Sequence, residues 1–515
     1  MMRPHPFQLK FPAALAVVAG VAAFAMPVLA QDNNAASQQN LPTAPSAVLL
    51  AAQDEGLGKP AGSDFKFTAP STQAGPGGAV IEAPQNGPLA LSLDDAIALG
   101  LARNVRLKYD KANQRAVHGD DLNVLNAILP DIKASGYTQA QEVNLAALGF
   151  KPSLFAGSHL LPAGYTINEI VKVNTTEAQL STNQQVVNLT DIELLRAVKN
   201  ETAVVDLNYL SSRGELVLAT GIAYLQVLAD QANLENAKGQ EADAKTTFDQ
   251  ADAKLKAGVG IGLDALRAQV DYQQRQQTTI ATEGTLAKDI IQLNRIIGLP
   301  AGQQLTLTDT APFTELDNMD LERAKTTAYA HRKDFLSLEQ QIIVAQKELK
   351  AVKYQRLPTL AFNGYYGVLG QTEGSYHGVF AAVGTLKFPI FNEGEQRGQE
   401  EQIGSQVTSL RQRQADLRVT VDSQIRSSML DVQSSEQLVK VAQSNVDLAK
   451  QELSDERDRF KAGVDDNLPV VDAEAQLTSA ESQLVRALYQ YNVAKLQLAR
   501  NTGVVETRYR TYLGK

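Results

Sequence analysis

An internal repeat limits what this chain can fold into. Residues 254–259 read KLKAGV, and residues 459–464 read RFKAGV. The residues around these phrases repeat with equal spacings in both copies: 37 residues for Leu93 to Pro130 and Leu321 to Pro358, and 40 for Gly258 to Gly298 and Gly463 to Gly503. Repeats of this length indicate that one structural unit is present twice.

Each copy is expected to begin with a helix of about 34 residues, about 50 Å long at 1.5 Å per residue. Pro130 and Pro358 end these helices, because the residue before a proline avoids the helical conformation. Beyond each proline the apolar residues alternate, as in residues 131–140 and 171–187 and again in 359–368 and 379–391. This pattern predicts one β-hairpin in each copy, 131–187 in the first and 359–391 in the second.

Long helices follow both hairpins, with apolar residues at steps of three and four. The steps run through residues 207–228, 439–453 and 477–498, a pattern typical of coiled-coil packing. Each copy is expected to contain one long helix and, beyond its KAGV turn, a shorter return helix. A soluble helical bundle would also explain the coiled-coil pattern, but it would not explain the hairpins.

The chain begins with a predicted secretory signal over residues 1–30. Arg3 and Lys10 precede an apolar run, and Val28 and Ala30 occupy the small-residue positions of a cleavage site. A membrane anchor is the alternative, but the run is short and no basic flank follows it. The remaining predicted parts are a flexible segment 31–88, a first repeat 89–300, a linker 301–318, a second repeat 319–505 and a C-terminal tail 506–515.

Composition excludes several functional classes. The net charge of −9 argues against a nucleic-acid binder. Cysteine is absent and the five histidines show no metal-ligand spacing. No nucleotide-binding glycine loop and no acid, base or nucleophile constellation occurs, so we expect no enzyme, cofactor or metal site.

The alternating strands point to a membrane location. No apolar run after the signal reaches the ~20 residues of a membrane helix, so only a closed barrel could cross a lipid bilayer. One chain supplies four such strands, whereas the smallest membrane barrels use about eight. Several copies must therefore share one barrel. The expected fold is mostly α, with a long coiled-coil α-helical barrel, a membrane β-barrel shared between copies and an internal tandem duplication. Three copies, which give a 12-stranded β-barrel in a trimer, are a hypothesis from this count together with the family resemblance described next.

The stretches LSLDDAIALGLARN, LPTLAFNGYYG and FAAVGTLKFPIFNEGEQRG, and the KAGV turns followed by LDAL and LPVV, carry a family resemblance. Over about residues 89–505 the chain resembles TolC-type outer-membrane efflux proteins. The resemblance implies a homotrimeric tunnel in the outer membrane of a Gram-negative-type cell, extending through the periplasm. It also implies a periplasmic adaptor, an inner-membrane pump or ABC transporter, and passive export in a tripartite efflux or type I secretion system.

The resemblance assigns both KAGV turns to the periplasmic tip, where the adaptor docks. The residues carried over as adaptor contacts are Lys256, Ala257, Gly258, Val259, Lys461, Ala462, Gly463 and Val464. The alternative is that the glycines only end the helices, because glycine readily adopts the positive φ of a helix C-terminus.

The resemblance also implies a periplasmic aperture lined by Asp264, Asp465, Asp466 and Asp472. Threefold symmetry would gather these carboxylates, which would attract cations and repel one another. Asp264 matches a family lock residue, but Asp465 stands where the family has its basic partner. Pro469 replaces a further acid. An acidic mouth is therefore what these residues predict, and a solvated charge cluster at a helix start is the alternative.

Two other functions also agree with parts of the sequence. A periplasmic adaptor would need a small all-β module between two helical arms, whereas the alternation here lies in two hairpins. A coiled-coil scaffold would form no barrel and conduct no ions. The sequence does not define the substrate: small molecules, metal ions and polypeptides all remain.

Overall fold

The computed structural model describes residues 87–144, 146–147, 169–259, 261–309, 313–316, 319–462, 464 and 468–514. The predicted signal 1–30 and almost all of the segment 31–88 lie outside these residues. Three predicted site residues, Gly463, Asp465 and Asp466, also lie outside them.

Two series of elements follow one another in the same order. The first series is α2 (Leu93–Arg103), α3 (Val105–Asn126), β2 (Asp131–Asn144), β3 (Ile170–Val187), α4 (Leu189–Lys256) and α5 (Gly262–Ile297). The second is α6 (Leu321–His331), α7 (Lys333–Tyr354), β5 (Thr359–Gln371), β6 (Tyr376–Lys387), α8 (Glu393–Lys461) and α9 (Leu468–Asn501). Corresponding helices match closely in length, with 11 residues in α2 and α6, 22 in α3 and α7, and 68 and 69 in α4 and α8.

The single helix predicted at the start of each copy is wrong, because both helices are interrupted. The backbone turns extended at Asn104, with ψ 128°, and at Arg332, with ψ 117°. Both residues are buried and bond distant parts of the chain. The Asn104 amide donates to the Ile296 carbonyl at 3.3 Å, and the Arg332 guanidinium donates to Gln424 at 2.7 Å. These contacts hold the interruption in place.

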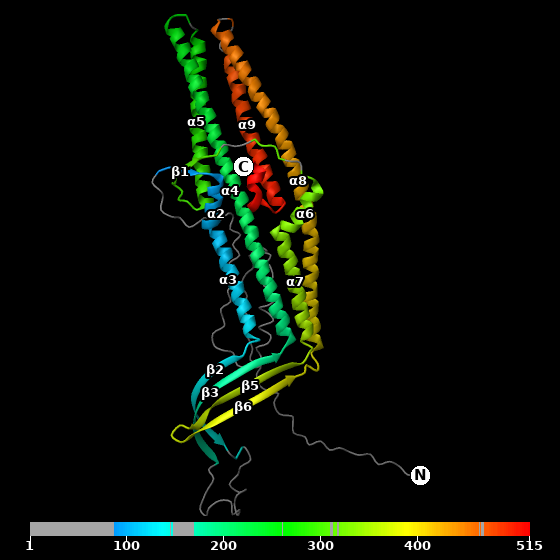
Figure 1. Ribbon diagram of the computed structural model, residues 1–515. Helices are drawn as coiled ribbons and strands as arrows, with labels where there is room; N and C mark the ends of the chain where they lie inside the picture. The colour runs from blue at the N-terminus through cyan, green and yellow to red at the C-terminus, as the bar shows by residue number, and fades with distance from the viewer. Residues whose placement is uncertain are drawn as a thin grey trace, which may run out of the picture. The chain divides into compact units, whose positions relative to one another are not determined.

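Helix α4 lies centrally among the helices and packs against α3, α5, α7 and α9. Figure 1 shows the α4–α5 and α8–α9 hairpins side by side, with their turns at the end away from the sheet. The main core includes Tyr224, Ile297, Tyr491, Leu496 and Leu513. No helix among the described ranges is long and apolar enough to cross a membrane.

The sequence predicted only a tail after residue 505, but the segment forms helix α10 (Val505–Leu513). Its buried Tyr509 donates a hydrogen bond to Asp94 in α2 at 2.6 Å, and Arg510 forms an ion pair with the same carboxylate at 3.1 Å. Near it, the two short strands β1 (Leu89–Leu91) and β4 (Leu305–Leu307) pair in parallel. The chain's C-terminal residues thus belong to the core.

The four longer strands form one antiparallel sheet in the order β2-β3-β5-β6. The register places Leu180, Tyr366 and Phe380 in one row across β3, β5 and β6. This row confirms the predicted alternation, because paired residues point to the same face. The return strand was predicted to reach residue 391 but ends at Lys387, since Pro389 cannot donate to a strand ladder.

Candidate functional site at the helix turns

The first KAGV turn ends α4 with a pair of backbone hydrogen bonds. The Ala257 amide donates to the Ala253 carbonyl at 3.0 Å, and the Val259 amide donates to the Lys254 carbonyl at 3.0 Å. Gly258 has a φ of 75°, the left-handed conformation expected from the sequence. A six-residue closure with glycine at this position is the Schellman C-terminus.

The second turn repeats these bonds at the end of α8. The Ala462 amide donates to the Asp458 carbonyl at 3.0 Å, and the Val464 amide donates to the Arg459 carbonyl at 3.1 Å. Lys461 is the last helical residue, and its side chain is not among those described. The repeated sequence therefore produces the same helix ending twice.

Each turn presents an apolar side chain to solvent. Val259 is 80% exposed and Val464 is 69% exposed, so neither valine contributes to the core of one chain. The Lys256 ammonium lies 2.5 Å from Asp252, and this hydrogen bond raises the pKa of Lys256. The first turn therefore presents an exposed valine beside a charged lysine, and the second turn presents an exposed valine.

Contacts that the sequence did not predict join the two turns. The Lys254 ammonium lies 4.4 Å from the centre of the Phe460 ring. Arg457 of α8 forms ion pairs with Asp243 of α4 at 2.9 Å and Glu474 of α9 at 3.0 Å. The sequence offered one signal for this contact, because both residues stand where the two copies of the phrase differ. Lys254 occupies the first position of KLKAGV, and Phe460 occupies the second position of RFKAGV.

A groove of about 360 Å³ lies between α5 and α9 near the turns. It is lined by Leu266, Arg267, Val270, Asp271, Gln274, Leu468 and Val471. Of the predicted aperture residues, Asp264 is half-buried in the first turn of α5, whereas Asp472 is exposed on α9. The two carboxylates therefore sit on different hairpins of one chain.

Further along the helices, a buried carboxylate of α4 lies beside a half-buried carboxylate of α5. Asp230 of α4 is 5% exposed and accepts a hydrogen bond from Gln226 at 3.0 Å. Burial raises the pKa of Asp230 to about 7, and the neighbouring Asp289 carboxylate of α5 adds to this rise. Tyr489 of α9 faces the pair, and burial together with both carboxylates raises its pKa.

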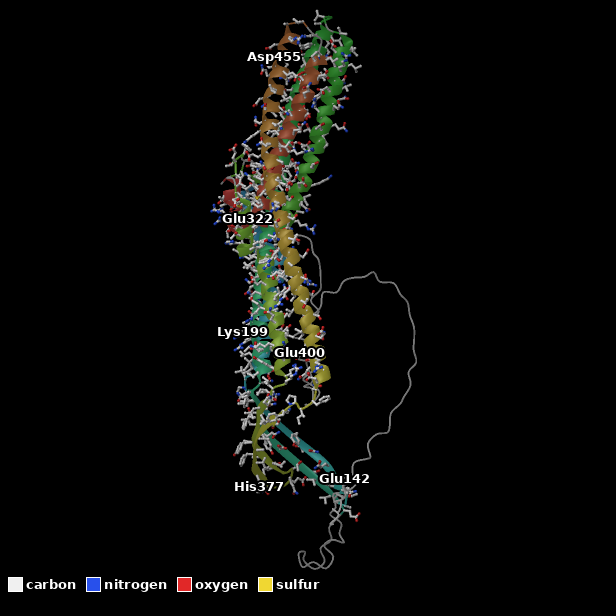
Figure 2. All side chains as sticks on the ribbon, turned by 90° about the vertical axis from the view of Figure 1, so that its right-hand side faces the viewer. Glu142, Lys199, Glu322, His377, Glu400 and Asp455 are labelled. Carbon is white, nitrogen blue, oxygen red and sulfur yellow. The ribbon has the colours of Figure 1, made fainter. Side chains whose placement is uncertain are left out.

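No group of three or more histidine, aspartate and glutamate side chains in the described part of the chain is placed to hold a metal ion. His377, for example, is exposed on β6 at the sheet end, far from Asp455 near the turns (Figure 2).

The described residues thus form two long helical hairpins joined to an antiparallel sheet with an exposed apolar row. The sequence profile of the family described as "Outer membrane efflux protein" matches residues 127–299 and 326–504, most of the chain and once in each series of elements. The chain belongs to this family.

Individual relatives are distant. The alkaline protease secretion protein AprF of Pseudomonas aeruginosa is 26% identical over 58% of this chain and 64% of its own length. The outer membrane protein TolC of Vibrio cholerae is 22% identical over 74% of this chain and 92% of its own length. The CmeC outer membrane channel of Campylobacter jejuni superimposes with a TM-score of 0.69 at 14% identity, covering 80% of this chain and 86% of CmeC. That likeness shows the fold alone.

Proposed function

We propose that this protein is the outer-membrane exit duct of a tripartite efflux or type I secretion system. It conducts substrates passively across the periplasm and the outer membrane of a Gram-negative-type cell. The observation that carries the proposal is the family match over both series of elements. The names of the relatives include protease secretion and toluene efflux, so both polypeptides and small molecules are substrate classes to test.

The sheet supports a shared barrel. Tyr366 is 70% exposed and Phe380 is 78% exposed, although they stand side by side in one row. An exposed apolar face of this kind is typical of the lipid-facing side of a membrane β-barrel. Strands β2 and β6 each pair on one side only within the described residues. Because an open sheet edge is not tolerated in lipid, these edges are proposed to pair between copies, and three copies would give twelve strands in a homotrimer.

The turns are proposed to be the docking surface for a periplasmic adaptor, which links the duct to an inner-membrane pump or ABC transporter. The exposed Val259 and Val464 support this, because an apolar residue at the tip of a helix gains burial only from a partner. Each chain has two turns, so a trimer would have six tips, three with each of the two turn sequences. Helix capping by Gly258 is compatible with this role.

We further propose that Asp264, Asp465, Asp466 and Asp472 make the periplasmic mouth acidic. The support is their place beside the two turns, which threefold symmetry would bring together. Conductance of reconstituted protein that changes neither with added divalent cations nor with Asp472→Ala would refute this assignment.

The central test is ion conductance of the purified full chain in planar lipid bilayers, together with its mass in mild detergent. We expect stable single-channel steps and the mass of a trimer. A monomer in mild detergent would contradict the shared barrel. A protein without conductance would instead fit a periplasmic adaptor or a structural scaffold.

A further inference from the structure

A buried carboxylate near the start of α4 gathers three cations. The Glu193 side chain is only 2% exposed and lies 2.6 Å from Arg196, 3.0 Å from Lys350 and 3.7 Å from Lys347. Burial alone would raise the pKa of Glu193, but its hydrogen bonds with Lys350 and Arg196 bring it below the usual value. Three positive charges therefore face one negative charge, and the cations keep solvent-exposed surface.

Two more lysines extend this group by one turn on each helix. Lys199 follows Arg196 by three residues on α4, and Lys353 follows Lys350 by three residues on α7, so each is a neighbour on the helix surface. Both are exposed, and neither forms a salt bridge with another described residue. Figure 2 shows Lys199 on the helical part near the sheet. We call Arg196, Lys199, Lys347, Lys350 and Lys353 the cationic row.

Nearby acids offset the row only in part. Burial raises the pKa of Asp191 on α4 to about 6 and that of Glu348 on α7 to about 7, and Glu201 adds to the second shift. Glu348 therefore carries only part of a charge at neutral pH. In a chain with a net charge of −9, the row is a local surplus of positive charge.

The row lies next to an apolar boundary. Strand β3 ends at Val187 and α4 begins at Leu189, and both of these residues are exposed. Arg196 follows Leu189 by seven residues, about 10 Å of helix. On the other helix, the exposed Leu357 stands between the end of α7 and the start of β5. Apolar side chains beside lysines and arginines are typical of segments that anchor at a lipid headgroup layer.

The row lies along two helices that pack against each other. Helix α4 packs against α7, with α3 on the other side of α4 and α8 on the other side of α7. The row therefore lies on the two inner helices, and copies that join at the outer helices do not cover it.

We propose that the cationic row binds the phosphate groups of anionic phospholipids in the periplasmic leaflet of the outer membrane. The inference rests on the proposed function, which places the sheet in that membrane. Each lysine or arginine near an anionic lipid surface contributes about a fivefold gain in binding. The row would thereby fix how deeply the sheet sits in the bilayer.

The test is native mass spectrometry of the full chain in detergent micelles that contain equal amounts of phosphatidylglycerol and phosphatidylcholine with the same acyl chains. We expect bound phosphatidylglycerol to exceed phosphatidylcholine several-fold, and the excess to shrink as salt rises. Lys199→Gln with Lys353→Gln removes two cations and leaves the three partners of Glu193 in place. We expect this variant to lose most of the preference.

The matched control is Lys245→Gln with Lys288→Gln, which removes two exposed lysines of α4 and α5 far from the sheet. It should keep the preference. Equal binding of both lipids to the unaltered chain would overturn the proposal, as would an unchanged preference in the Lys199 and Lys353 variant. Release of the lipid by millimolar inorganic phosphate would also overturn it, by assigning the row to a soluble anion.

Conductance in phosphatidylcholine bilayers is measured for the same proteins. The Lys199 and Lys353 variant should conduct like the unaltered chain. If the proposed channel function is wrong, no protein conducts, whatever its lipid preference. The two failures are therefore distinguishable.

Discussion

The Lys254 ammonium of the first turn lies over the Phe460 ring of the second, 4.4 Å from its centre. The two residues come from different repeats and are 206 positions apart in the sequence. This contact joins α4 to α8 at the ends of both long helices. It makes the two turns one unit within a chain.

Phe460→Leu should loosen both turns, because it removes the ring that attracts the Lys254 ammonium. Such a contact is worth about 0.5–1 kcal/mol at an exposed site. Amide hydrogen exchange at residues 254–259 and 459–464 should accelerate about two- to fivefold. Phe460→Tyr keeps an aromatic face and serves as the control. Equal exchange in the leucine variant would show that the ion pairs of Arg457 alone hold the turns together.

Asp230 and its neighbour Asp289 should make the stability of the folded chain depend on pH. The pKa of Asp230 is about 7 in the folded chain, raised first by burial and then by Asp289, and about 3.9 when unfolded. The folded state therefore binds more protons between these values. This stabilisation is fully present below pH 4 and is lost as pH rises through 7. Asp289→Asn should flatten the fall in melting temperature between pH 5 and 8, whereas Asp472→Asn, on an exposed carboxylate, should leave it unchanged.

Local sequence rules predicted most elements because their causes are local. Gly258 ends α4, and the alternating residues of β5 and β6 face the same side. The interruptions at Asn104 and Arg332 could not be predicted in this way. The Asn104 amide donates to the carbonyl of Ile296, 192 positions away in the sequence. A local sequence pattern does not show a partner at that distance, because only the tertiary fold brings the two residues together.

Only part of the candidate site could be predicted, because some of its contacts are local and others join distant parts of the sequence. The turns are encoded by their own residues, whereas the Lys254–Phe460 contact needs both hairpins in place. Helix α10 was missed because its nine residues give a short pattern, and its burial depends on Asp94 near the other end of the described chain.

Two glycines with the same left-handed backbone should respond differently to alanine. At Gly258 a Cβ would meet nothing within 4 Å, so Gly258→Ala should cost only the about 1–2 kcal/mol of the strained φ. At Gly503 a Cβ would lie 2.6 Å from the Arg332 backbone nitrogen, which cannot move aside easily. Gly503→Ala should therefore cost about 3 kcal/mol or more. Urea unfolding of both variants measures the difference, and equal midpoints would contradict the close approach of the Gly503 backbone to Arg332.

Charge on the two faces of β6 should have unequal effects. Phe380 lies in the apolar row with Tyr366, and Val383 pairs with Asn363 on the opposite face. If the apolar row meets lipid, Phe380→Arg should cost about 2–4 kcal/mol near the bilayer midplane, whereas a charge on the lumen face is tolerated. We expect Phe380→Arg to reduce the fraction of chain that inserts into phosphatidylcholine vesicles and resists protease, and Val383→Arg to leave it near the unaltered level. Both side chains are exposed in the single chain, so the comparison separates lipid contact from simple exposure. If both variants insert equally well, the apolar row does not face lipid.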